Sequence, residues 1–559
     1  MHAFAFALIV SLAATPRAQP RTAVDALFRS VNQPGMPGCA VGIVRRGALA
    51  LSRSYGLADI ENGVPIGVNT RFDLGSMSKQ FLALAILILA DEGKLGLDED
   101  VHRYLPELAS FSEPVTLRHL LHHTSGLKDY DQLLQLAGWV DGDRKSFQDI
   151  WWIIQRQKRL AYRPGTQHSY SDTNYFLLGL IAQRVTKTPL DELLQQLIFR
   201  PLGMSHTTLR TNPWRLVPHK AWPYLVQDGK PQLYINGEEP LGDGGLFSTV
   251  ADLALWERNF ETAKVGGARV FEEMVRVEAL PDGTANDYAA GLYIRRYRGR
   301  QMIEHAGASY GYLAEKLRFP EQRLSIILLC NRRDAPYVEL SNRLADLFLG
   351  LRAREELPAP VEVEDELALL GGTYFNEATS DTLVLEAVNR RLVNLVDDAI
   401  YRPVAPMTFE FPSSGRLCRC ATTLTFRSEP GGSVQELTAT TASATGKPTV
   451  LTYRRVQSGR GTAALTDYVG EYVSDDVATS WCLRRNGDTL LVRRRGAADR
   501  PSQFLLDDVV DAPGGFIHFQ RAGGQVTGFV LRNKRVHAVE FRKLPAGQHP
   551  IPEPFSCSS

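Results

Sequence analysis

A serine and a lysine three positions apart, Ser76 and Lys79, come immediately before the apolar run Phe81 to Ala90. The run is too short to cross a bilayer, so we expect a buried helix that begins at Ser76 and ends near Glu92, with Gly93 just beyond its end. Residues at this spacing share one helical face, and a helix start presents free backbone N–H groups. An ammonium group and backbone donors beside a hydroxyl favour a nucleophilic serine that attacks a carbonyl carbon.

Length and charge limit the kind of partner. The chain has 559 residues, enough for about two to four domains, and 63 basic residues nearly balance 62 acidic ones, for a net charge of +1. This balance gives no reason to expect a polyanionic partner. The basic cluster Arg295 to Arg300 contains a central glycine and apolar neighbours, which favours an exposed hairpin. We therefore predict no nucleic-acid partner.

Residues 22–352 mix helical and strand patterns. A hairpin is expected around Arg45-Arg46-Gly47, a short helix over Val115 to His122, and another helix after Thr249 as its N-cap. Further strands are predicted at residues 291–297, 313–319 and 324–329. Strands at both ends of the region with helices between them indicate an α+β domain, in which an antiparallel sheet is closed by the two chain ends and flanked by helices.

A charged, proline-bearing segment, Arg354 to Pro360, marks a domain boundary. Beyond it the helical period gives way to short alternating strands with turn signals. The sequence Leu370 to Tyr374 recurs in similar form at Tyr468 to Tyr472, which indicates an internal repeat. We predict two small antiparallel β-barrel domains, at residues 364–456 and 465–545, followed by a tail from about residue 546.

The amino terminus is the one segment that bears on location. The apolar run Phe4 to Ala14 is followed by small residues and a proline, a pattern typical of a secretory signal peptide, although no Lys or Arg precedes the run. We predict a signal peptide over residues 1–18 and a periplasmic or secreted protein.

The six cysteines leave two readings open. Cys418 and Cys420 point the same way if they lie in a strand, so either could form a disulfide with Cys482; free, partly buried thiols are equally compatible with the sequence. Their spacing is not that of a zinc site, and the adjacent His122 and His123 indicate a helix end or a packing feature. We predict no metal and no cofactor.

Two further motifs follow the Ser76 motif in the chain. The first is Tyr170 to Tyr175 (Tyr-Ser-Asp-Thr-Asn-Tyr), and the second is His305-Ala306-Gly307. Together with His123 to Leu127 and Gly242 to Thr249, they resemble, in the same order, the motifs of the serine β-lactamase and penicillin-binding-protein superfamily. The likeness covers about 330 residues and is strongest to the class C-like branch with its esterase and D-aminopeptidase relatives. It implies a β-lactamase-like catalytic domain at residues 22–352.

The resemblance implies a role for each matching residue. Ser76 would be the nucleophile and Lys79 the charged neighbour that keeps it acidic. Tyr170 would be general base and then general acid, with a pKa lowered by Lys79. The backbone N–H groups of Ser76 and Ala308 would form the oxyanion hole. His305 stands where β-lactamases have lysine, and would orient substrate or tune Tyr170.

Two substrate-binding positions complete the implied site. Gly307 belongs to the strand that receives the substrate, and Asp172 stands where the family usually has asparagine. A carboxylate can accept a hydrogen bond from Lys79 but cannot donate one to an amide carbonyl of the substrate. This departure argues against efficient hydrolysis of β-lactams.

Two lipocalin-like barrels after such a catalytic domain are similar to the architecture of the D-aminopeptidases of this superfamily. In that group a loop of the last domain reaches the rim of the active site and favours a free amino terminus. The acidic stretch with Asp507, Asp508 and Asp511 is a candidate for that loop, and a solvated hairpin tip is the other interpretation.

The sequence thus predicts a serine hydrolase that forms an acyl-enzyme on Ser76. Its substrates would be small esters or D-residue-containing peptides, with cell-wall peptides among the candidates. The alternative is a β-lactamase or penicillin-recognising protein that is acylated, turns over slowly and serves in binding or sensing. Substrate identity, stereochemical preference, the role of the β domains and the oligomeric state stay open at this level.

Overall fold

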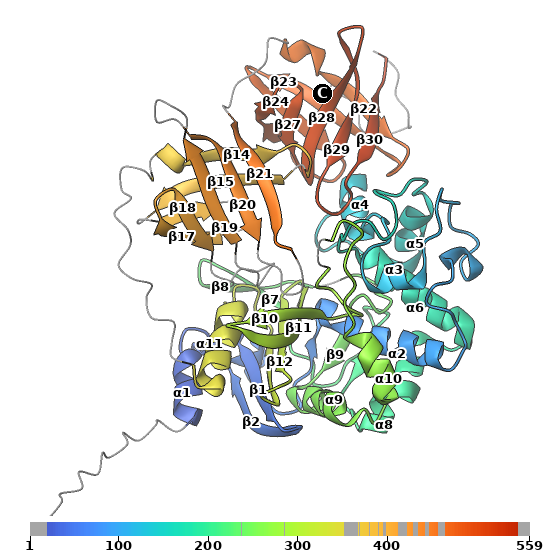
Figure 1. Ribbon diagram of the computed structural model, residues 1–559, viewed down its shortest axis with the longest axis vertical. Helices are drawn as coiled ribbons and strands as arrows, with labels where there is room; N and C mark the ends of the chain where they lie inside the picture. The colour runs from blue at the N-terminus through green and yellow to red at the C-terminus, as the bar shows by residue number, and fades with distance from the viewer. Residues whose placement is uncertain are drawn as a thin grey trace, which may run out of the picture.

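The computed structural model describes residues 20–545, except 236, 284–285, 352–366, 368, 380, 389–390, 395–398, 412–421, 429–433, 442–446 and 457–463. The predicted signal peptide, linker and tail lie outside these residues. Helices and a sheet from the first 351 residues form the lower part of Figure 1, and two β sheets from the rest lie above them. Among the described residues, no helix is both long and apolar enough to cross a membrane.

The central sheet of the first part has six antiparallel strands in the order β10-β11-β12-β13-β1-β2. The first hairpin, β1 and β2, turns at Arg46 and Gly47, as predicted, with positive φ at both residues. Strand β1 pairs with β13, so the two ends of the domain meet in the sheet, also as predicted. The strand bounds are β1 Cys39–Arg45, β2 Ala48–Tyr55, β10 Tyr293–Tyr297, β11 Arg300–Ser309, β12 Tyr312–Phe319 and β13 Leu324–Cys330.

Helices cover both faces of this sheet. Helices α1 and α11 pack on one face, and α9 packs on the other (Figure 1). The remaining helices form a separate layer around α2 and α6, beside small sheets made by β3–β4, β5-β9-β6 and β7–β8. The bounds are α1 Pro20–Leu27, η1 Gly75–Ser78, α2 Lys79–Asp91, η2 Val101–Arg103, α3 Leu117–Leu121, α4 Tyr130–Ala137, α5 Phe147–Gln155, α6 Asp172–Thr186, α7 Leu190–Leu194, η3 Gln195–Phe199, α8 Arg200–Leu202, α9 Val250–Thr262, α10 Gly267–Met274 and α11 Tyr337–Leu349. The small strands are β3 Leu57–Asp59, β4 Val64–Pro65, β5 Phe72–Asp73, β6 Thr208–Leu209, β7 Tyr224–Gln227, β8 Lys230–Leu233 and β9 Leu246–Ser248.

The helix expected from Ser76 begins differently from the prediction. Residues Gly75–Ser78 form a 3₁₀ turn, η1, and the α-helix α2 starts only at Lys79. The helix is buried on all sides, which explains why its apolar residues show no amphipathic stripe. It ends at Asp91, and Gly93 follows with φ +71°, in agreement with the predicted end. Thr249 caps α9, because its hydroxyl accepts from the backbone N–H of Asp252.

The two β sheets of the carboxyl-terminal part are barrel-shaped. The first is a closed barrel of β14 to β21, in chain order, and the second is a nine-stranded sheet in the order β25-β24-β23-β22-β30-β29-β28-β27-β26. The bounds of the first are β14 Gly372–Asn376, β15 Asp381–Val388, β16 Arg391–Asn394, β17 Ala399–Ala405, β18 Thr408–Phe411, β19 Thr422–Ser428, β20 Val434–Thr441 and β21 Thr449–Val456. Those of the second are η4 Leu465–Asp467, β22 Gly470–Ser474, β23 Thr479–Asn486, β24 Thr489–Arg494, β25 Arg500–Ser502, β26 Phe504–Leu506, β27 Val509–Ala512, β28 Gly515–Ala522, β29 Gln525–Arg532 and β30 Val539–Lys543.

The internal repeat corresponds to the same tyrosine hydrogen bond in each of the two β sheets. In the first barrel the buried Tyr374 donates its hydroxyl hydrogen to the carbonyl of Leu370 at 2.9 Å, and in the second Tyr472 does the same to Tyr468 at 2.7 Å. Each tyrosine lies on the first strand of its sheet and ties that strand to the segment before it. The two sheets are therefore related units, as the repeat predicted.

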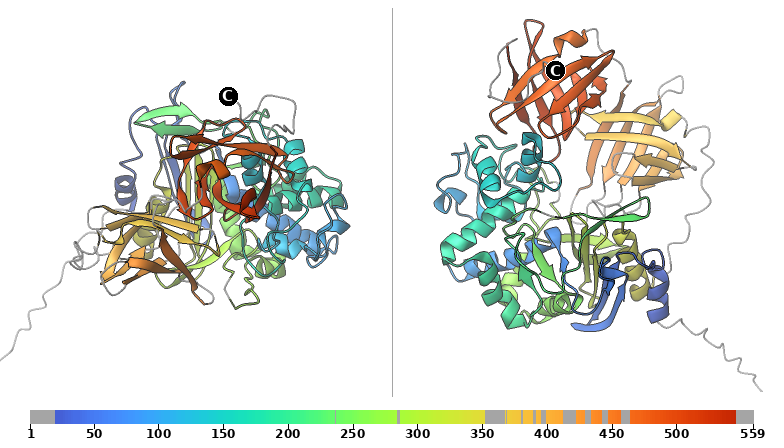
Figure 2. Two further views of the ribbon diagram at one scale, coloured as in Figure 1. Left: turned by 90° about the horizontal axis from the view of Figure 1, so that it is seen from above. Right: turned by 180° about the vertical axis from the view of Figure 1, so that it is seen from behind.

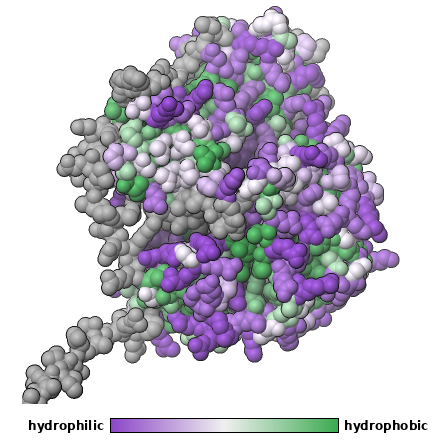
Figure 3. All heavy atoms as spheres, viewed as in Figure 1, coloured by the Kyte–Doolittle hydropathy of each residue, from purple (hydrophilic) through white to green (hydrophobic). Residues whose placement is uncertain are grey.

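The last sheet docks on the catalytic part beside α4 and α5 (Figure 1; right panel of Figure 2). Trp481 on β23 is fully buried there and donates from its indole to the carbonyl of Leu136 on α4 at 3.1 Å. Apolar residues of both parts belong to one continuous buried cluster. On the face drawn in Figure 3, by contrast, apolar residues show only in small groups on a mostly hydrophilic surface. A continuous core fixes the last sheet firmly on the catalytic domain.

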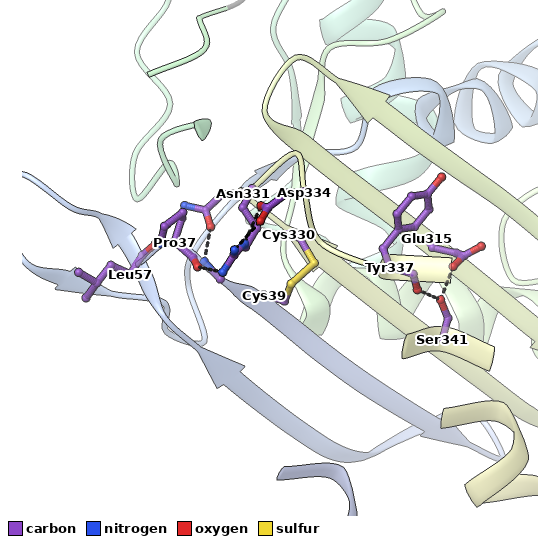
Figure 4. Close-up of a disulfide and its surroundings, with 11 residues drawn as sticks. Pro37, Cys39, Leu57, Glu315, Cys330, Asn331, Asp334, Tyr337 and Ser341 are labelled. Carbon is purple, nitrogen blue, oxygen red and sulfur yellow. Dashed lines mark hydrogen bonds and ion pairs between the residues drawn. A yellow bond between two sulfur atoms is a disulfide. The ribbon is translucent and has the colours of Figure 1, made fainter. Parts of the chain in front are cut away.

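A disulfide joins the two strands that close the central sheet. Cys39 on β1 lies directly opposite Cys330 on β13, and their sulfur atoms are bonded (Figure 4). The sequence did not predict this pair, because two cysteines that lie 291 positions apart carry no local signal of their contact. Cys482 is also disulfide-bonded. The partners predicted for it, Cys418 and Cys420, lie outside the described residues.

Candidate active site

The Ser76 and Lys79 side chains meet as the spacing predicted. Ser76 lies in the 3₁₀ turn η1, in which side chains three positions apart lie one above the other. The Lys79 side chain is fully buried, and its Nζ donates to Ser76 Oγ at 3.0 Å. Ser76 itself is partly exposed and lines a groove of about 540 Å³. A buried cation therefore contacts the Ser76 hydroxyl from the protein side of the groove.

Two further oxygens fix the ammonium group of Lys79. Nζ donates to Asp172 Oδ1 and to the backbone carbonyl of Asp243, each at 2.7 Å. Burial opposes the charge, but Asp172, Tyr170 and Asp243 outweigh it and hold the pKa of Lys79 above its ordinary value. Lys79 is thus a cation throughout the physiological pH range. All three of its hydrogens are directed, one of them at the nucleophile.

Two glycines let the backbone of η1 lie against β11. A Cβ added to Gly75, which has φ +50°, would lie 2.8 Å from backbone atoms of Ala308. A Cβ on Gly307 would lie 1.8 Å from the carbonyl oxygen of Leu74. The backbone of Ser76 is therefore adjacent to that of Ala308, and these are the two residues predicted to supply the oxyanion hole. Gly75, Ser76, Gly307 and Ala308 all border the same groove.

Tyr170 lies next to Ser76 and Lys79, in the segment just before α6. The Lys79 nitrogen lies 5.0 Å from the centre of its ring. Its hydroxyl is enclosed and makes no hydrogen bond to any described residue. We predicted a lowered pKa, and that direction is wrong: burial raises the pKa of Tyr170, and Lys79 and Ser76 offset only part of the effect. The hydroxyl is consequently a phenol in the resting site at neutral pH.

The His123 motif holds the Tyr170 segment in place. His123 Nδ1 accepts from the backbone N–H of Ser171 at 3.2 Å and from the Asn174 amide at 3.0 Å, and the Ser125 hydroxyl donates to Asn174 Oδ1 at 2.7 Å. The imidazole ring packs 4.3 Å from the ring of Tyr170. The sequence treated His123 as a packing feature. In the structure that packing fixes the predicted base.

His305 lies in the site as a neutral, fixed imidazole. Its Nδ1 is 2.6 Å from the Ala306 carbonyl, which can only accept, so Nδ1 carries the ring hydrogen and Nε2 accepts from the Tyr288 hydroxyl at 3.1 Å. Burial and the charge of Lys79 lower its pKa to about 3. Because both nitrogens are engaged, His305 is suited to shaping the groove and positioning Tyr288, and not to taking up a proton.

Asp172 is the first residue of α6 and sits between two cations. Its Oδ1 pairs with Lys79, and its Oδ2 lies 3.6 Å from Arg535 Nη1. The backbone N–H of Asp172 donates to Asp129 Oδ2 at 2.8 Å. Burial opposes ionisation, yet Lys79 and Arg535 lower the pKa of Asp172. Its oxygens are engaged by these cations, as expected for a residue that only accepts.

Arg535 comes from the loop between β29 and β30, so a residue of the last sheet does reach the catalytic centre. The predicted acidic stretch is not the segment that does so. Asp508 instead accepts from Tyr468 and Arg521 within the last sheet, and Asp511 accepts from the backbone of Gln503. The loop at the site carries Lys534 and Arg535 and is basic.

A group of acidic side chains lines the groove beyond Lys79. The Tyr130 hydroxyl lies 3.0 Å from Glu238 Oε1 and 2.5 Å from Asp243 Oδ2, and its single hydrogen goes to the nearer carboxylate, that of Asp243. Lys145 pairs with Asp131 close by. Burial raises the pKa of Glu238 to about 8, because Lys145 offsets only part of the cost. The sequence gave no periodic or motif signal for these residues, since they come from separate loops.

An antiparallel sheet with helices on both faces, bearing a serine in the turn before a buried helix and beside strand β11, defines a β-lactamase-like catalytic domain. Residues 24–349 match the family described as Beta-lactamase, which is more than half of the chain. The chain belongs to the β-lactamase family, and the resemblance drawn from its motifs is confirmed.

Curated relatives in this family include proteins named D-aminopeptidase. That of Gluconobacter oxydans is 31% identical over 62% of this chain and 64% of its own length. That of Brucella anthropi is 25% identical over 66% of this chain and 69% of its own. A penicillin-binding protein of Bacillus subtilis is 28% identical over 59% of this chain and 76% of its own. The chain thus spans about two thirds of the length of the D-aminopeptidases that it matches.

Solved structures share the fold at lower identity. The octameric penicillin-binding protein homologue from Pyrococcus abyssi has a TM-score of 0.55 at 20% identity, covering 86% of this chain and 98% of its own. The D-amino acid amidase of Ochrobactrum anthropi SV3 in complex with D-phenylalanine has a TM-score of 0.51 at 21% identity, covering 59% and 99%. The first of these likenesses extends well beyond the catalytic domain into the β sheets.

Proposed function

We propose that the protein is a serine hydrolase that forms an acyl-enzyme on Ser76 and acts on D-residue-containing peptides or amides, or on small esters. One observation carries the proposal: the fully buried Lys79 donates to the Ser76 hydroxyl, which faces the groove. A cation fixed by three acceptors stabilises the serine oxygen as it loses its proton, and it is in place before substrate binds.

In the proposed reaction Tyr170 takes the proton of Ser76 as Oγ attacks the substrate carbonyl carbon. The negative charge then moves to the carbonyl oxygen, which the backbone N–H groups of Ser76 and Ala308 would hold. Tyr170 returns the proton to the leaving amine or alcohol, and water repeats the sequence to release the acid. Because burial raises the pKa of Tyr170, the phenolate that starts the cycle is a minority form at neutral pH.

The proposed substrate class is supported by relatives named D-aminopeptidase and by the acidic groove. Glu238, whose raised pKa leaves it largely protonated at neutral pH, would ionise more readily beside a substrate ammonium group than beside an extra carboxylate, which favours substrates that carry an ammonium group. Cell-wall peptides, which contain D-residues, belong to this class as well.

The first test compares the native protein with Ser76→Ala on p-nitroanilides of D- and L-amino acids, p-nitrophenyl acetate and butyrate, and a chromogenic cephalosporin. We expect release of nitroaniline or nitrophenol that depends on Ser76, with the D-amino acid anilides preferred over the L-amino acid anilides. Equal release by the variant, or none by either protein, would remove the proposed chemistry for these substrates.

The second candidate is a β-lactamase or penicillin-recognising protein that is acylated and turns over slowly. The relative that is a penicillin-binding protein favours it. Against rapid β-lactam turnover, Asp172 presents only acceptors and is engaged by Lys79 and Arg535. A fluorescent penicillin separates the two: a stable adduct on Ser76 with no turnover of the anilides would support the second candidate.

We further propose that the protein is exported to the periplasm or secreted. The apolar run Phe4 to Ala14 and the buried Cys39–Cys330 disulfide support this location, because structural disulfides persist mainly in oxidising compartments. Amino-terminal sequencing of protein recovered outside the cytoplasm tests it: a start near residue 19 is expected, and an intact Met1 would contradict it.

A further inference from the structure

The β29–β30 loop places one cation, Arg535, at the centre of the site. Its Nη1 lies 3.7 Å from Asp129 Oδ2 and 3.6 Å from Asp172 Oδ2, and the guanidinium carbon lies 5.3 Å from the centre of the Tyr170 ring. The side chain borders the groove that contains Ser76 and is 39% exposed. A residue of the last sheet thus contacts the same carboxylate that holds Lys79.

The loop is tied at several points, so this position is fixed. Asn533 Oδ1 accepts from the backbone N–H groups of Arg535 and Val536, each at 2.8 Å. The carbonyl of Arg535 accepts from the backbone N–H of Asp129 at 3.2 Å, and that of Lys534 accepts from the Ser169 hydroxyl at 3.0 Å. Bonds on both sides of Arg535 direct its side chain inward.

The two carboxylates that meet Arg535 are close neighbours. Asp129 is fully buried and accepts the backbone N–H of Asp172, so two acids share one small volume. Burial and the charge of Asp172 raise the pKa of Asp129 to about 7, and Arg535 opposes that shift. Without Arg535, Lys79 would be the only cation that forms an ion pair with either acid among the described residues.

We propose that Arg535 is a positioning residue that keeps Asp172 ionised and directed at Lys79, so that the last β sheet completes the charge balance of the catalytic centre. The inference deepens the proposed function and rests on it. It also accounts for the departure from the family pattern: a carboxylate at position 172 adds a negative charge that an asparagine would not, and Arg535 compensates for it.

The other charged and titratable groups around the Asp172–Asp129 pair come from five elements or loops. They are Lys79 on α2, Tyr170 before α6, Asp131 on α4, Lys145 before α5, and Asp243 on the loop before β9. Lys145 is engaged by Asp131 and Glu238, and Lys79 is shared with Ser76 and Asp243. Arg535 is the cation whose ion pairs, among the described residues, are confined to Asp129 and Asp172.

The activity test uses Arg535→Gln, Arg535→Lys and the control Lys534→Ala, with the best substrate of the Ser76 panel. Lys534 is the neighbouring cation, but its ammonium pairs with Asp381 of the first barrel. At low pH, where protonation of Asp172 adds to the Tyr170 slope, we expect the extra fall of the kcat/KM profile to begin about one pH unit higher in Arg535→Gln, the low end of what an opposite charge does to a nearby carboxylate. Arg535→Lys should restore most of the profile, and Lys534→Ala should match the native protein. An unchanged onset of this fall in Arg535→Gln would overturn the inference while leaving the proposed function intact.

A second variant shows whether Asp172 is the group that Arg535 serves. In an Asp172→Asn background the carboxylate is absent, so adding Arg535→Gln should shift the low-pH part of the profile by less than half as much as it does in the native chain. An equal shift in both backgrounds would assign the effect of Arg535 to another group, and the proposal would fail.

A third measurement does not need turnover. Carbon-13 labelling of aspartate carboxyl groups, with the Asp172 signal assigned by its loss in Asp172→Asn, gives the titration of Asp172 directly. We expect its midpoint to rise by about one pH unit in Arg535→Gln. If the native protein showed no Ser76-dependent turnover, the proposed function would fail, yet this shift would still uphold the electrostatic role of Arg535. An unmoved signal would refute that role.

Discussion

Gly307 lies so close to Leu74 that a methyl group at its Cβ position would stand 1.8 Å from the Leu74 carbonyl oxygen. This contact presses β11 against the turn that carries Ser76. The distance between the backbone of Ser76 and that of Ala308, and with it the shape of the proposed oxyanion hole, depends on the absence of a side chain at position 307.

Gly307→Ala should therefore impair catalysis more than folding. The added methyl forces η1 and β11 apart, and a displacement of about 1 Å near the reacting atoms costs about 100-fold in rate. Overpacking should also lower the free energy of unfolding by about 1–3 kcal/mol. Steady-state kinetics and urea unfolding measure the two effects. Gly67→Ala is the control, because its Cβ would meet no atom within 4 Å, and it should change neither.

The Lys79–Asp172 pair should behave as a buried ion pair in stability measurements. Lys79→Met leaves the Asp172 carboxylate beside Asp129 without its main partner, which should cost about 3 kcal/mol in the free energy of unfolding. Adding Asp172→Asn removes the uncompensated charge and should recover more than half of that loss, although the enzyme stays inactive. Urea unfolding of Lys79→Met and of Lys79→Met/Asp172→Asn measures the free energy of unfolding of each. Equal free energies of unfolding in the single and the double variant would show that Lys79 and Asp172 do not stabilise each other.

Tyr170 gives the site a characteristic pH dependence. Its pKa is raised from an ordinary value near 10, so the phenolate fraction at neutral pH is small and grows about tenfold per pH unit. If Tyr170 accepts the Ser76 proton, log kcat/KM should rise with pH from 7 to 9 without a plateau. Tyr170→Phe should lose about 10²–10⁴-fold in rate and the slope with it.

Tyr234→Phe serves as the control for Tyr170→Phe, because Tyr234 also lines the groove, where its hydroxyl donates to Asp141 and not to the Ser76 group. Its pH profile should follow that of the native protein. A native profile that is flat between pH 7 and 9 would instead count against Tyr170 as the group that takes up the Ser76 proton.

Local signals in the sequence predicted the parts of the site that a single element supplies. The spacing of Ser76 and Lys79 fixes their contact, whether the turn is α or 3₁₀, because both helices bring positions three apart together. The Gly242 to Thr249 motif, singled out by its resemblance to the family, does lie at the site, because the Asp243 carbonyl accepts from Lys79. Such features depend on neighbours in the chain.

The rest of the site depends on how separate domains pack, and no local pattern encodes that. Arg535 reaches Asp172 only because the last sheet docks on α4, through contacts such as that of Trp481 with Leu136. The acidic stretch at Asp508 was a reasonable alternative from charge alone, but Tyr468 and Arg521 already satisfy it within its own sheet. The direction of the Tyr170 pKa also follows from burial, which composition does not reveal.

The Cys39–Cys330 disulfide should stabilise the catalytic domain without taking part in catalysis. It links β1 to β13 across 291 positions, so it restricts the unfolded chain strongly, and a native disulfide typically contributes about 2–5 kcal/mol. Both sulfur atoms are buried, and the bond lies two strands away from β11 in the sheet order. We expect Cys39→Ala/Cys330→Ala to unfold at lower urea concentration and to keep the native kcat/KM at 25 °C.

Because Cys482 is bonded elsewhere, it remains oxidised in this variant, and any loss of stability belongs to the Cys39–Cys330 bond. Unchanged stability would mean that hydrogen bonding between β1 and β13 alone holds the two ends of the domain together.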